Sequence, residues 1–517
     1  MSFCTVLSAA VQGLSVEMIR VEADVSNGLP MFHMVGYLSS EVKEASERVR
    51  TAIRNSGMKL PAKKIIVNLA PATVRKRGAS FDLPIALAVL AAMNYVPEEA
   101  LKGVAVIGEV SLEGKIRGVS GVLPIVMEAK NQGCTACILP EENEIEGRLV
   151  SGIKILPADN LEKLCAYLNG DEKEIHRKKQ GRSSAQRNIF ENKKEDFSDI
   201  CGQNAVKRAA EIAVAGGHNL LMAGPPGSGK SMIARRIATI LPELSLEESL
   251  EITRIYSVLG MIDKEQPLIT RRPFRSVHHT ITKTALVGGG MTPRPGEISM
   301  AHGGVLFLDE LVEFPRNVLE VLRQPLEEHQ IHIARNYGNF TFPAEFMLVA
   351  AMNPCPCGNY PDMQKCSCTP SQIQKYLGKI SQPFLDRMDL CIETPKVEYR
   401  ELDIERIGKK EEESSEVIRS RVVEARKLQK KRYEGTQIRT NSMLGPGEIR
   451  TYIPLGSAER KLMEKAFERM GLTARTYHKI LRVARTIADL DYSEKVTEKH
   501  LKEAIAYRSL DKKYWGR

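Results

Sequence analysis

Eight residues with the spacing G-x-x-x-x-G-K-[ST] constrain this chain more than any other feature of its sequence. They follow an apolar stretch, His218–Ala223, and precede an amphipathic one, Ser231–Leu241, so the predicted order is strand, loop and helix. Glycines let main-chain N–H groups approach phosphates, and the helix N-terminus adds positive potential. The sequence therefore predicts a nucleotide-binding loop formed by Gly224, Pro225, Pro226, Gly227, Ser228, Gly229, Lys230 and Ser231.

Two adjacent carboxylates end a second apolar stretch. Residues Val305–Leu308 are typical of a buried strand, and Asp309 and Glu310 follow directly. Such a pair faces the crevice beyond the carboxyl ends of parallel strands, where α/β proteins bind ligands. We expect Ser231 and Asp309 to hold Mg²⁺, while Lys230 contacts the β- and γ-phosphates of ATP. Glu310 is expected to polarise the attacking water, so the sequence predicts an ATPase.

Hydrophobic periodicity divides the 517 residues into four segments. Residues 1–168 mix short apolar strands with a buried helix, which indicates an α+β domain. Residues 169–197 are charged and aperiodic, as in a linker. Strands alternate with helices in residues 198–400, which predicts an α/β fold with a parallel sheet. Residues 401–517 show a helical pattern throughout.

The formal net charge of +10 is unevenly distributed. Residues 401–517 carry 27 basic and 19 acidic side chains, a net charge of +8, and the rest of the chain is close to neutral. The run Lys427–Arg432, which reads KLQKKR, is the strongest local concentration. It is either a contact surface for nucleic acid or a solvated helix face.

Nothing in the sequence predicts a membrane partner. The first 20 residues lack the basic and apolar segments of a signal peptide. The longest apolar run, Leu83–Met93, is shorter than the roughly 20 residues that cross a bilayer. We therefore expect a cytoplasmic protein.

Four cysteines form the pattern C-x-C-x8-C-x-C within a short stretch rich in proline and glycine. Four thiolates satisfy tetrahedral Zn²⁺, although C-x-C is tighter than the usual C-x2-C spacing. The alternatives are a structural zinc site and four free thiols. The candidate ligands are Cys355, Cys357, Cys366 and Cys368.

The segments around these motifs resemble the AAA+ ATPases of the magnesium-chelatase and MCM-helicase clade. The resemblance implies that Asn353 is the sensor-1 residue and that Arg387, in the stretch LDRMD, is an arginine finger for a neighbouring subunit. A salt bridge from Arg387 to Asp386 or Asp389 is the alternative. Arg475 matches the sensor-2 position at the start of a predicted helix, and Arg482 and Arg485 on the same helix are the alternatives. A finger acting on a neighbour implies self-association into a ring, which in this clade is a hexamer.

A strand pair is predicted over Gln330–Phe346, around Gly338 and Asn339. The clade inserts a pore-facing hairpin at this point. Arg335, together with Asn336 and Tyr337, is predicted near its tip, where it would touch a polymer or simply face solvent.

The N-terminal segment resembles the Lon-type peptidase domain, whose fold is shared with ribosomal protein S5. Ser80, in RKRGASFD, falls at the position of the nucleophile. The lysine of the Ser–Lys dyad is replaced by Leu123. Leucine cannot accept the hydroxyl proton, so we expect no peptidase activity.

Taken together, the three regions resemble the ComM (YifB) family of magnesium-chelatase-like AAA+ proteins. The most specific stretches are FRSVHHT, GGGMTPRPGEISMAHGGVLFLDEL and ARTYHKILRVARTIADL. The resemblance implies an ATP-driven DNA motor that performs branch migration or unwinding on single-stranded or branched DNA and promotes its integration during natural transformation. A protein-remodelling ATPase and a chelatase-type motor acting on a partner enzyme are the alternatives.

Overall fold

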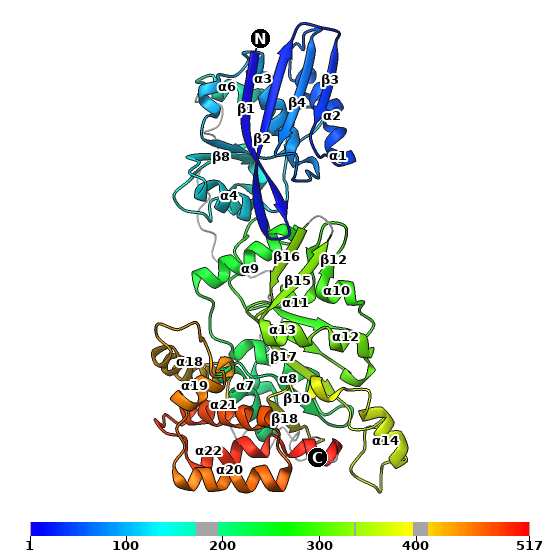
Figure 1. Ribbon diagram of the computed structural model, residues 1–517, viewed down its shortest axis with the longest axis vertical. Coiled ribbons are helices and arrows are strands. Elements are labelled where there is room, and N and C mark those ends of the chain that lie inside the picture. The colour runs from blue at the N-terminus through cyan, green and yellow to red at the C-terminus, as the bar shows by residue number, and fades with distance from the viewer. Residues whose placement is uncertain (1, 172–194, 336–337, 397–411, 516–517) are drawn as a thin grey trace.

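The computed structural model describes residues 2–171, 195–335, 338–396 and 412–515. In Figure 1 the N-terminal region, in blue and cyan, stands at one end of an elongated molecule. The central region, in green and yellow, follows it, and the C-terminal helices pack beside the far end of the central region. Most of the predicted linker 169–197 lies outside the described residues. Phe197, at its end, is buried in the core of the central region.

The N-terminal region is built on a mixed seven-stranded sheet in the order β3-β4-β2-β1-β5-β8-β9. The β1–β2 and β2–β4 pairs are antiparallel and the other pairs are parallel. The strands are β1 (Ser2–Gln12), β2 (Ser15–Ser26), β3 (Met31–Val35), β4 (Lys64–Ala70), β5 (Val104–Val106), β8 (Ala136–Pro140) and β9 (Lys154–Ala158). A small hairpin, β6 (Glu109–Val110) with β7 (Ile116–Arg117), precedes β8.

Helix α3 (Asp82–Ala92) forms the centre of this region and is buried along its whole length. Its sequence is apolar on every side, as expected for a helix enclosed by other elements. Its single acidic residue, Asp82, accepts two hydrogen bonds of 2.9 Å from Arg48, which compensates the buried charge. The other helices are α1 (Ser40–Lys43), α2 (Ala45–Asn55), α4 (Val122–Asn131), α5 (Glu144–Gly147) and α6 (Leu161–Leu168).

The central region contains a five-stranded parallel sheet in the order β11-β14-β17-β10-β18. The strands are β10 (Leu220–Ala223), β11 (Phe274–Val277), β14 (Val305–Leu308), β17 (Met347–Met352) and β18 (Leu390–Glu393). Strands β10, β14 and β17 are buried at every position, which explains their continuous apolar sequences, because helices cover both faces of a parallel sheet. The predicted α/β class with a parallel sheet is confirmed.

The helices of the central region follow or cross between these strands. They are α7 (Asn204–Gly216), α8 (Lys230–Ile237), α9 (Leu246–Leu259), α10 (Lys283–Val287), α11 (Glu297–Met300), α12 (Arg316–Glu320), α13 (Arg323–Glu328), α14 (Pro370–Leu377) and α15 (Gln382–Leu385). Helix α9 begins at a capping box in which Ser245 and Glu248 each bond the other's main-chain N–H.

Two hairpins project from the central region, β12 (Gly288–Gly289) with β13 (Arg294–Pro295), and β15 (Gln330–Arg335) with β16 (Gly338–Pro343). The turn predicted at Gly338 and Asn339 is wrong, because both residues are already paired in β16, opposite Arg335 and Ala334. Asn336 and Tyr337, predicted near the tip, lie outside the described residues.

The C-terminal region is helical, as predicted. Its helices are α18 (Ser415–Arg432), α19 (Pro446–Tyr452), α20 (Ser457–Met470), α21 (Ala474–Leu490), α22 (Glu498–Ala506) and α23 (Ser509–Trp515). Helices α18 and α21 pack against α7 and share one hydrophobic core with a face of the central sheet. No helix within the described ranges has the length and apolar character to cross a membrane.

A buried joint connects the N-terminal and central regions. Helix α4 packs on α9, and the N–H of Gly121 donates to the carbonyl oxygen of Ser257 at 2.9 Å. The Ser257 hydroxyl donates to the carboxyl group of Glu146 at 2.6 Å. Burial raises the pKa of Glu146, opposed by hydrogen bonds that include one from the N–H of Leu123. Leu123 belongs to this joint through its N–H, and its side chain is fully buried.

Candidate nucleotide site

The predicted nucleotide-binding loop connects the end of β10 to the start of α8. Gly227 and Gly229 have φ angles of +75° and +84°, a region that favours glycine. Gly224 is required for a different reason. A Cβ atom there would stand 2.2 Å from the carbonyl oxygen of Thr394. The sequence therefore folds into a tight turn that leaves its main chain close to the crevice.

The Lys230 side chain lies folded within this loop. Its ammonium group donates to the carbonyl oxygens of Gly224 and Pro225 at 2.8 and 2.9 Å. Only 8% of the residue is exposed, and this burial lowers the pKa of Lys230, opposed by the charge of Asp309. Lys230 Nζ also lies 3.3 Å from Oδ1 of Asn353, at the end of β17. Lys230, expected to contact phosphate, and the predicted sensor amide of Asn353 therefore share one crevice.

The predicted magnesium ligands also meet there. The Ser231 hydroxyl donates to Oδ2 of Asp309 at 2.6 Å. Asp309 directly follows β14, which is separated from β10 only by β17. A hydroxyl and a carboxylate in contact beside the phosphate loop match the oxygen ligands that Mg²⁺ takes in nucleotide sites.

Glu310 has an unusual backbone and an unpredicted neighbour. Its φ angle is +52°, uncommon for a residue other than glycine and a form of strain that clusters at functional sites. Its side chain is 57% exposed, and Oε2 lies 3.2 Å from Nδ1 of His279, without the alignment of a hydrogen bond. His279 follows β11, beside β14 in the sheet. Our sequence reasoning missed this residue, although it lies in the stretch FRSVHHT.

The two other predicted arginines meet a common carboxylate. Arg387 Nη2 lies 2.6 Å from Oε1 of Glu327, and Arg475 Nη2 lies 3.6 Å from the same atom. The Arg387 side chain is 7% exposed, and it also donates to the carbonyl oxygen of Pro383. Arg475 is 61% exposed. The role of Glu327 as their common partner could not be predicted, because this residue of α13 belongs to no recognisable sequence motif.

The alternative partners that were considered for Arg387 are occupied by other groups. Asp386 accepts a hydrogen bond of 2.8 Å from Gln382, and Asp389 pairs with Lys479 at 3.1 Å. On helix α21, Arg485 is buried against Asp489 at 2.9 Å, which makes its role structural. Arg475 and Arg482 therefore remain the sensor-2 candidates on this helix, and Arg475 is the one at its start.

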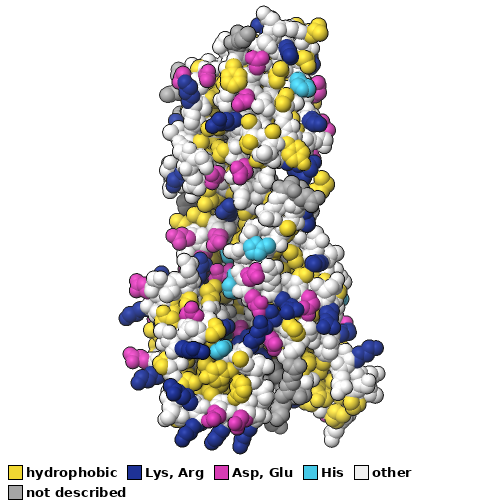
Figure 2. Space-filling model, in the orientation of Figure 1, with side chains coloured by type: hydrophobic (Ala, Val, Ile, Leu, Met, Phe, Trp, Pro, Cys, Tyr) yellow, Lys and Arg dark blue, Asp and Glu magenta, His cyan; other side chains and the backbone are white. Residues whose placement is uncertain are grey.

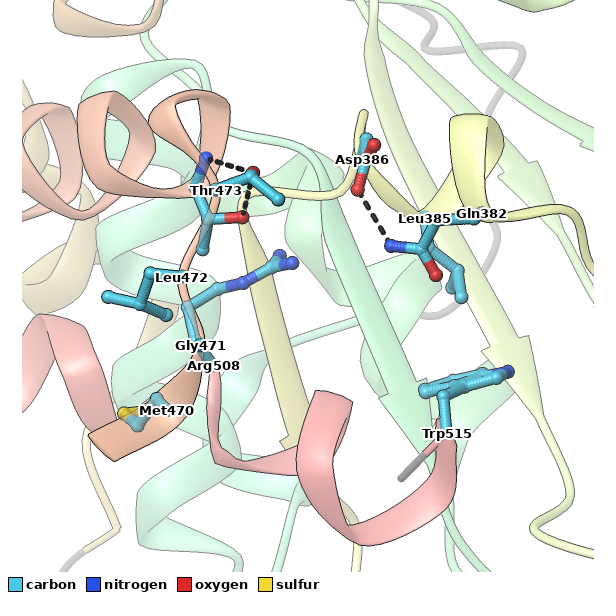
Figure 3. A pocket seen from close by; sticks show the side chains of 10 residues that line it. Gln382, Leu385, Asp386, Met470, Gly471, Leu472, Thr473, Arg508 and Trp515 are labelled. Atoms are coloured by element: carbon cyan, nitrogen blue, oxygen red, sulfur yellow. Dashed lines mark hydrogen bonds between the residues drawn. The ribbon is translucent and has the colours of Figure 1, made fainter. Parts of the chain in front are cut away.

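A small pocket marks the seam between the C-terminal helices and the central region in this area. In Figure 3, Leu472 and Thr473 of the α20–α21 turn lie on one side, and Leu385 and Asp386 at the end of α15 lie on the other. Trp515 borders the same pocket. Arg387 follows Asp386 in the chain, so the candidate finger stands beside this seam.

The four cysteines form one cluster at the start of the loop after Asn353. Their sulfur atoms all lie within 4.8 Å of one another, close enough to bind a single metal ion. Three of the sulfur pairs are separated by 3.4 to 3.7 Å. Hydrogen bonds, of which that from the N–H of Asn359 is the largest cause, lower the pKa of the Cys357 thiol to about 5, whereas the neighbouring sulfurs help to raise the pKa of Cys366 and Cys368. The cluster fits a soft divalent metal.

A phosphate loop after β10 in a parallel sheet of order β11-β14-β17-β10-β18, with an Asp-Glu pair after β14 and a polar amide after β17, defines the class of AAA+ ATPases. Three family profiles match the chain. "Magnesium chelatase, subunit ChlI" matches residues 196–402, "Magnesium chelatase, subunit ChlI C-terminal" matches residues 412–508, and "Subunit ChlI of Mg-chelatase" matches residues 21–143.

Similar proteins extend this match over the whole chain. The chain is 44% identical to the uncharacterized protein YifB of Escherichia coli over 512 residues, which cover 99% of this chain and 98% of that protein. It is 42% identical to the competence protein ComM of Haemophilus influenzae over 517 residues, with the same coverage. The chain therefore belongs to the YifB/ComM family of magnesium-chelatase-like AAA+ proteins, and the predicted family is confirmed.

The N-terminal region has a second similarity. It is 26% identical to the Lon protease of Trichlorobacter lovleyi over 160 residues, 29% of this chain and 19% of that protein. This bears out the predicted Lon-like fold. Ser80 lies in a short turn before α3 and its carbonyl oxygen accepts from Gly108, whereas Leu123 lies in α4. The absence of peptidase activity remains a prediction.

Proposed function

We propose that this chain is an ATP-driven DNA motor that promotes branch migration or unwinding when incoming DNA is integrated in natural transformation and recombination. ATP hydrolysis is the best-supported part of the proposal. The observation that carries it is the contact of Ser231 with Asp309 beside Lys230, with Glu310 directly after Asp309. In this assignment Ser231 and Asp309 hold Mg²⁺, Lys230 binds the phosphates, and Glu310 polarises the attacking water.

DNA as the substrate is supported by two exposed arginines on neighbouring hairpins. A Cβ atom at Gly289 of β12 would lie 3.7 Å from Nη2 of Arg335 at the end of β15, so the hairpins are neighbours. Arg335 and Arg294 of β13 are both exposed. Two guanidinium groups on adjacent projecting hairpins suit the phosphates of a polymer. The name of the Haemophilus relative, a competence protein, points the same way.

A ring is part of this proposal. Arg387 and Arg475 share Glu327 at the seam beside α15, and we assign them to the γ-phosphate of a neighbouring subunit in a hexamer. Asn353 would hold the water and the γ-phosphate within its own subunit. We further propose Zn²⁺ as the metal of the four-cysteine cluster and the cytoplasm as the location.

A protein-remodelling or chelatase-type ATPase is the competing function, and stimulation of ATP hydrolysis separates the two. We expect single-stranded, duplex or branched DNA to raise turnover at low salt, and expect this gain to fall steeply with ionic strength. Branch-migration and strand-displacement assays, with Glu310→Gln as the hydrolysis-deficient control, then test the motor directly. Turnover that is indifferent to all three DNA forms would favour a protein partner.

A further inference from the structure

The cysteine loop lies directly against the nucleotide-binding loop. Gly358, which follows Cys357, has a φ angle of +81°. A Cβ atom at Gly358 would stand 2.3 Å from Cδ and 3.0 Å from Cγ of Pro226. Separations this short cannot exist between real atoms, so the Gly358 main chain and the Pro226 ring are already in van der Waals contact. A loop that follows β17 thus supports the middle of the phosphate loop that follows β10.

The cysteine cluster fixes the position of this glycine. The N–H of Gly358 donates to the carbonyl oxygen of Cys355 at 3.0 Å, and Cys355 is fully buried. The main-chain N–H of Tyr360 points to the Cys355 sulfur at 3.4 Å. Gly358 is therefore held by a hydrogen bond to Cys355 and by its peptide bond to Cys357, and a metal bound by the four sulfurs would lock it there.

The other end of the same loop begins at the nucleotide site. Asn353, whose amide oxygen lies 3.3 Å from Lys230, precedes Cys355 by two residues. The loop has no long helix or strand of its own between Met352 and Pro370. Its conformation therefore depends on the cluster more than on main-chain ladders. The loop therefore touches the nucleotide site at two places, Asn353 at its start and Gly358 within the cysteine cluster.

We propose that a metal ion held by Cys355, Cys357, Cys366 and Cys368 positions the phosphate loop through the contact of Gly358 with Pro226, and so sets the affinity for nucleotide. Gly358 is a positioning residue, since it acts through Pro226. Without the metal, part of the binding energy must be used to order the phosphate loop, which weakens the apparent affinity. The inference rests on the proposed nucleotide site.

The first experiment needs no substitution. Full-length protein is prepared with one zinc per chain, and a matched sample is stripped with a chelator under reducing conditions. The Kd of a fluorescent ATP analogue is then measured with Mg²⁺ in excess. We expect a Kd about fivefold to tenfold higher in the stripped sample, and recovery when Zn²⁺ is restored. Equal Kd values, or isolated protein with four free thiols and no metal, would overturn the inference.

The second experiment tests the contact itself. Gly358→Ala places a methyl group against Pro226, so we expect a similar rise in Kd while zinc stays at one per chain. Gly133→Ala is the matched control, because Gly133 has a φ angle of +80° and no atom within 4 Å of its would-be Cβ. It should bind nucleotide like the wild type.

Removal of the proline ring should relieve the clash. We expect the double variant Gly358→Ala with Pro226→Ala to bind nucleotide more tightly than Gly358→Ala alone. A Gly358→Ala protein with wild-type affinity, or a Gly133→Ala protein with the same defect, would overturn the proposed contact. Zinc-loaded wild type that binds no nucleotide would instead overturn the nucleotide site, so the two failures are distinguishable.

Discussion

The imidazole of His279 lies 3.2 Å from the carboxylate of Glu310, across the ends of the neighbouring strands β11 and β14. Glu310 has a left-handed backbone conformation, so two features that are uncommon on their own coincide at one residue. The residue expected to polarise the attacking water therefore has both a close polar neighbour and an uncommon main-chain conformation, and we infer that His279 helps to position it.

Replacement of His279 should slow hydrolysis while nucleotide still binds. We expect His279→Ala to lower kcat by about tenfold to a hundredfold, because small misplacements of a reacting group cost this much, while the Kd for ATP stays near wild type. Steady-state turnover and equilibrium binding provide the two readings. If the role is positional, adding His279→Ala to Glu310→Gln should have no further effect on kcat.

Two substitutions separate binding from chemistry at the nucleotide site. Lys230→Ala should weaken ATP binding, because it removes the cation expected to contact the phosphates. Glu310→Gln should bind ATP normally but hydrolyse it at least about a hundredfold more slowly. Titration of a fluorescent nucleotide and a phosphate-release assay measure the two effects. Unchanged binding in the first variant and unchanged turnover in the second would contradict the assignment.

Arg387→Ala should abolish hydrolysis without loss of nucleotide binding if Arg387 acts on a neighbouring subunit. Mixing Arg387→Ala protein with Lys230→Ala protein should then restore part of the turnover. In a mixed assembly, the intact nucleotide site of an Arg387→Ala subunit can face the intact Arg387 of a Lys230→Ala subunit. A mixture of Lys230→Ala with Glu310→Gln is the control, since both changes damage the same half of the site. Equal inactivity of the two mixtures would argue against action between subunits.

The basic run on α18 offers a test of DNA contact. Lys427, Lys430 and Lys431 are exposed, whereas Arg432 pairs with the buried Asp489 and is needed for the fold. Figure 2 shows Lys and Arg side chains gathered over the C-terminal helices. We expect the triple change of these lysines to glutamate to weaken DNA binding and to flatten its salt dependence. DNA affinity equal to wild type would assign the run to a solvated surface.

His218 should make the fold sensitive to acid. It is fully buried, its Nε2 lies 2.8 Å from the Thr486 hydroxyl, and burial lowers the pKa of His218 to about 4. Between pH 6.5 and 4 the unfolded chain takes up a proton that the folded chain refuses, so stability falls as the pH falls. The loss is about 3 kcal/mol for a shift of this size. Denaturant unfolding from pH 7 to pH 5 should show a smaller loss for His218→Gln than for the wild type.

The sequence could predict those parts of the site whose positions are determined by a contiguous motif or by the order of the strands. The phosphate loop is contiguous, and Asp309 and Asn353 each follow an apolar strand, so a parallel sheet gathers them at one edge. Side-chain partners from separate elements could not be predicted. Glu327 meets Arg387 across 60 residues of sequence, and nothing in α13 distinguishes it from other surface acids.

The same distinction applies to the fold: local patterns could be predicted from the sequence, and contacts between distant segments could not. The buried strands β10 and β14 were predicted close to their actual bounds, because their sequences are continuously apolar. The hairpin β15–β16 was predicted with its turn displaced, since an Asn after a Gly resembles a turn even where it pairs in a strand. The requirement for glycine at position 358 could not be predicted from the sequence, because it comes from Pro226, which is close to Gly358 in space but far from it along the chain.

The joint between Glu146 and Ser257 has a mechanical consequence. It lies where α4 begins, the part of the Lon-like region in which a peptidase would carry its lysine. Here that surface is closed against α9 by buried hydrogen bonds. We therefore expect the N-terminal and central regions to move together where they meet.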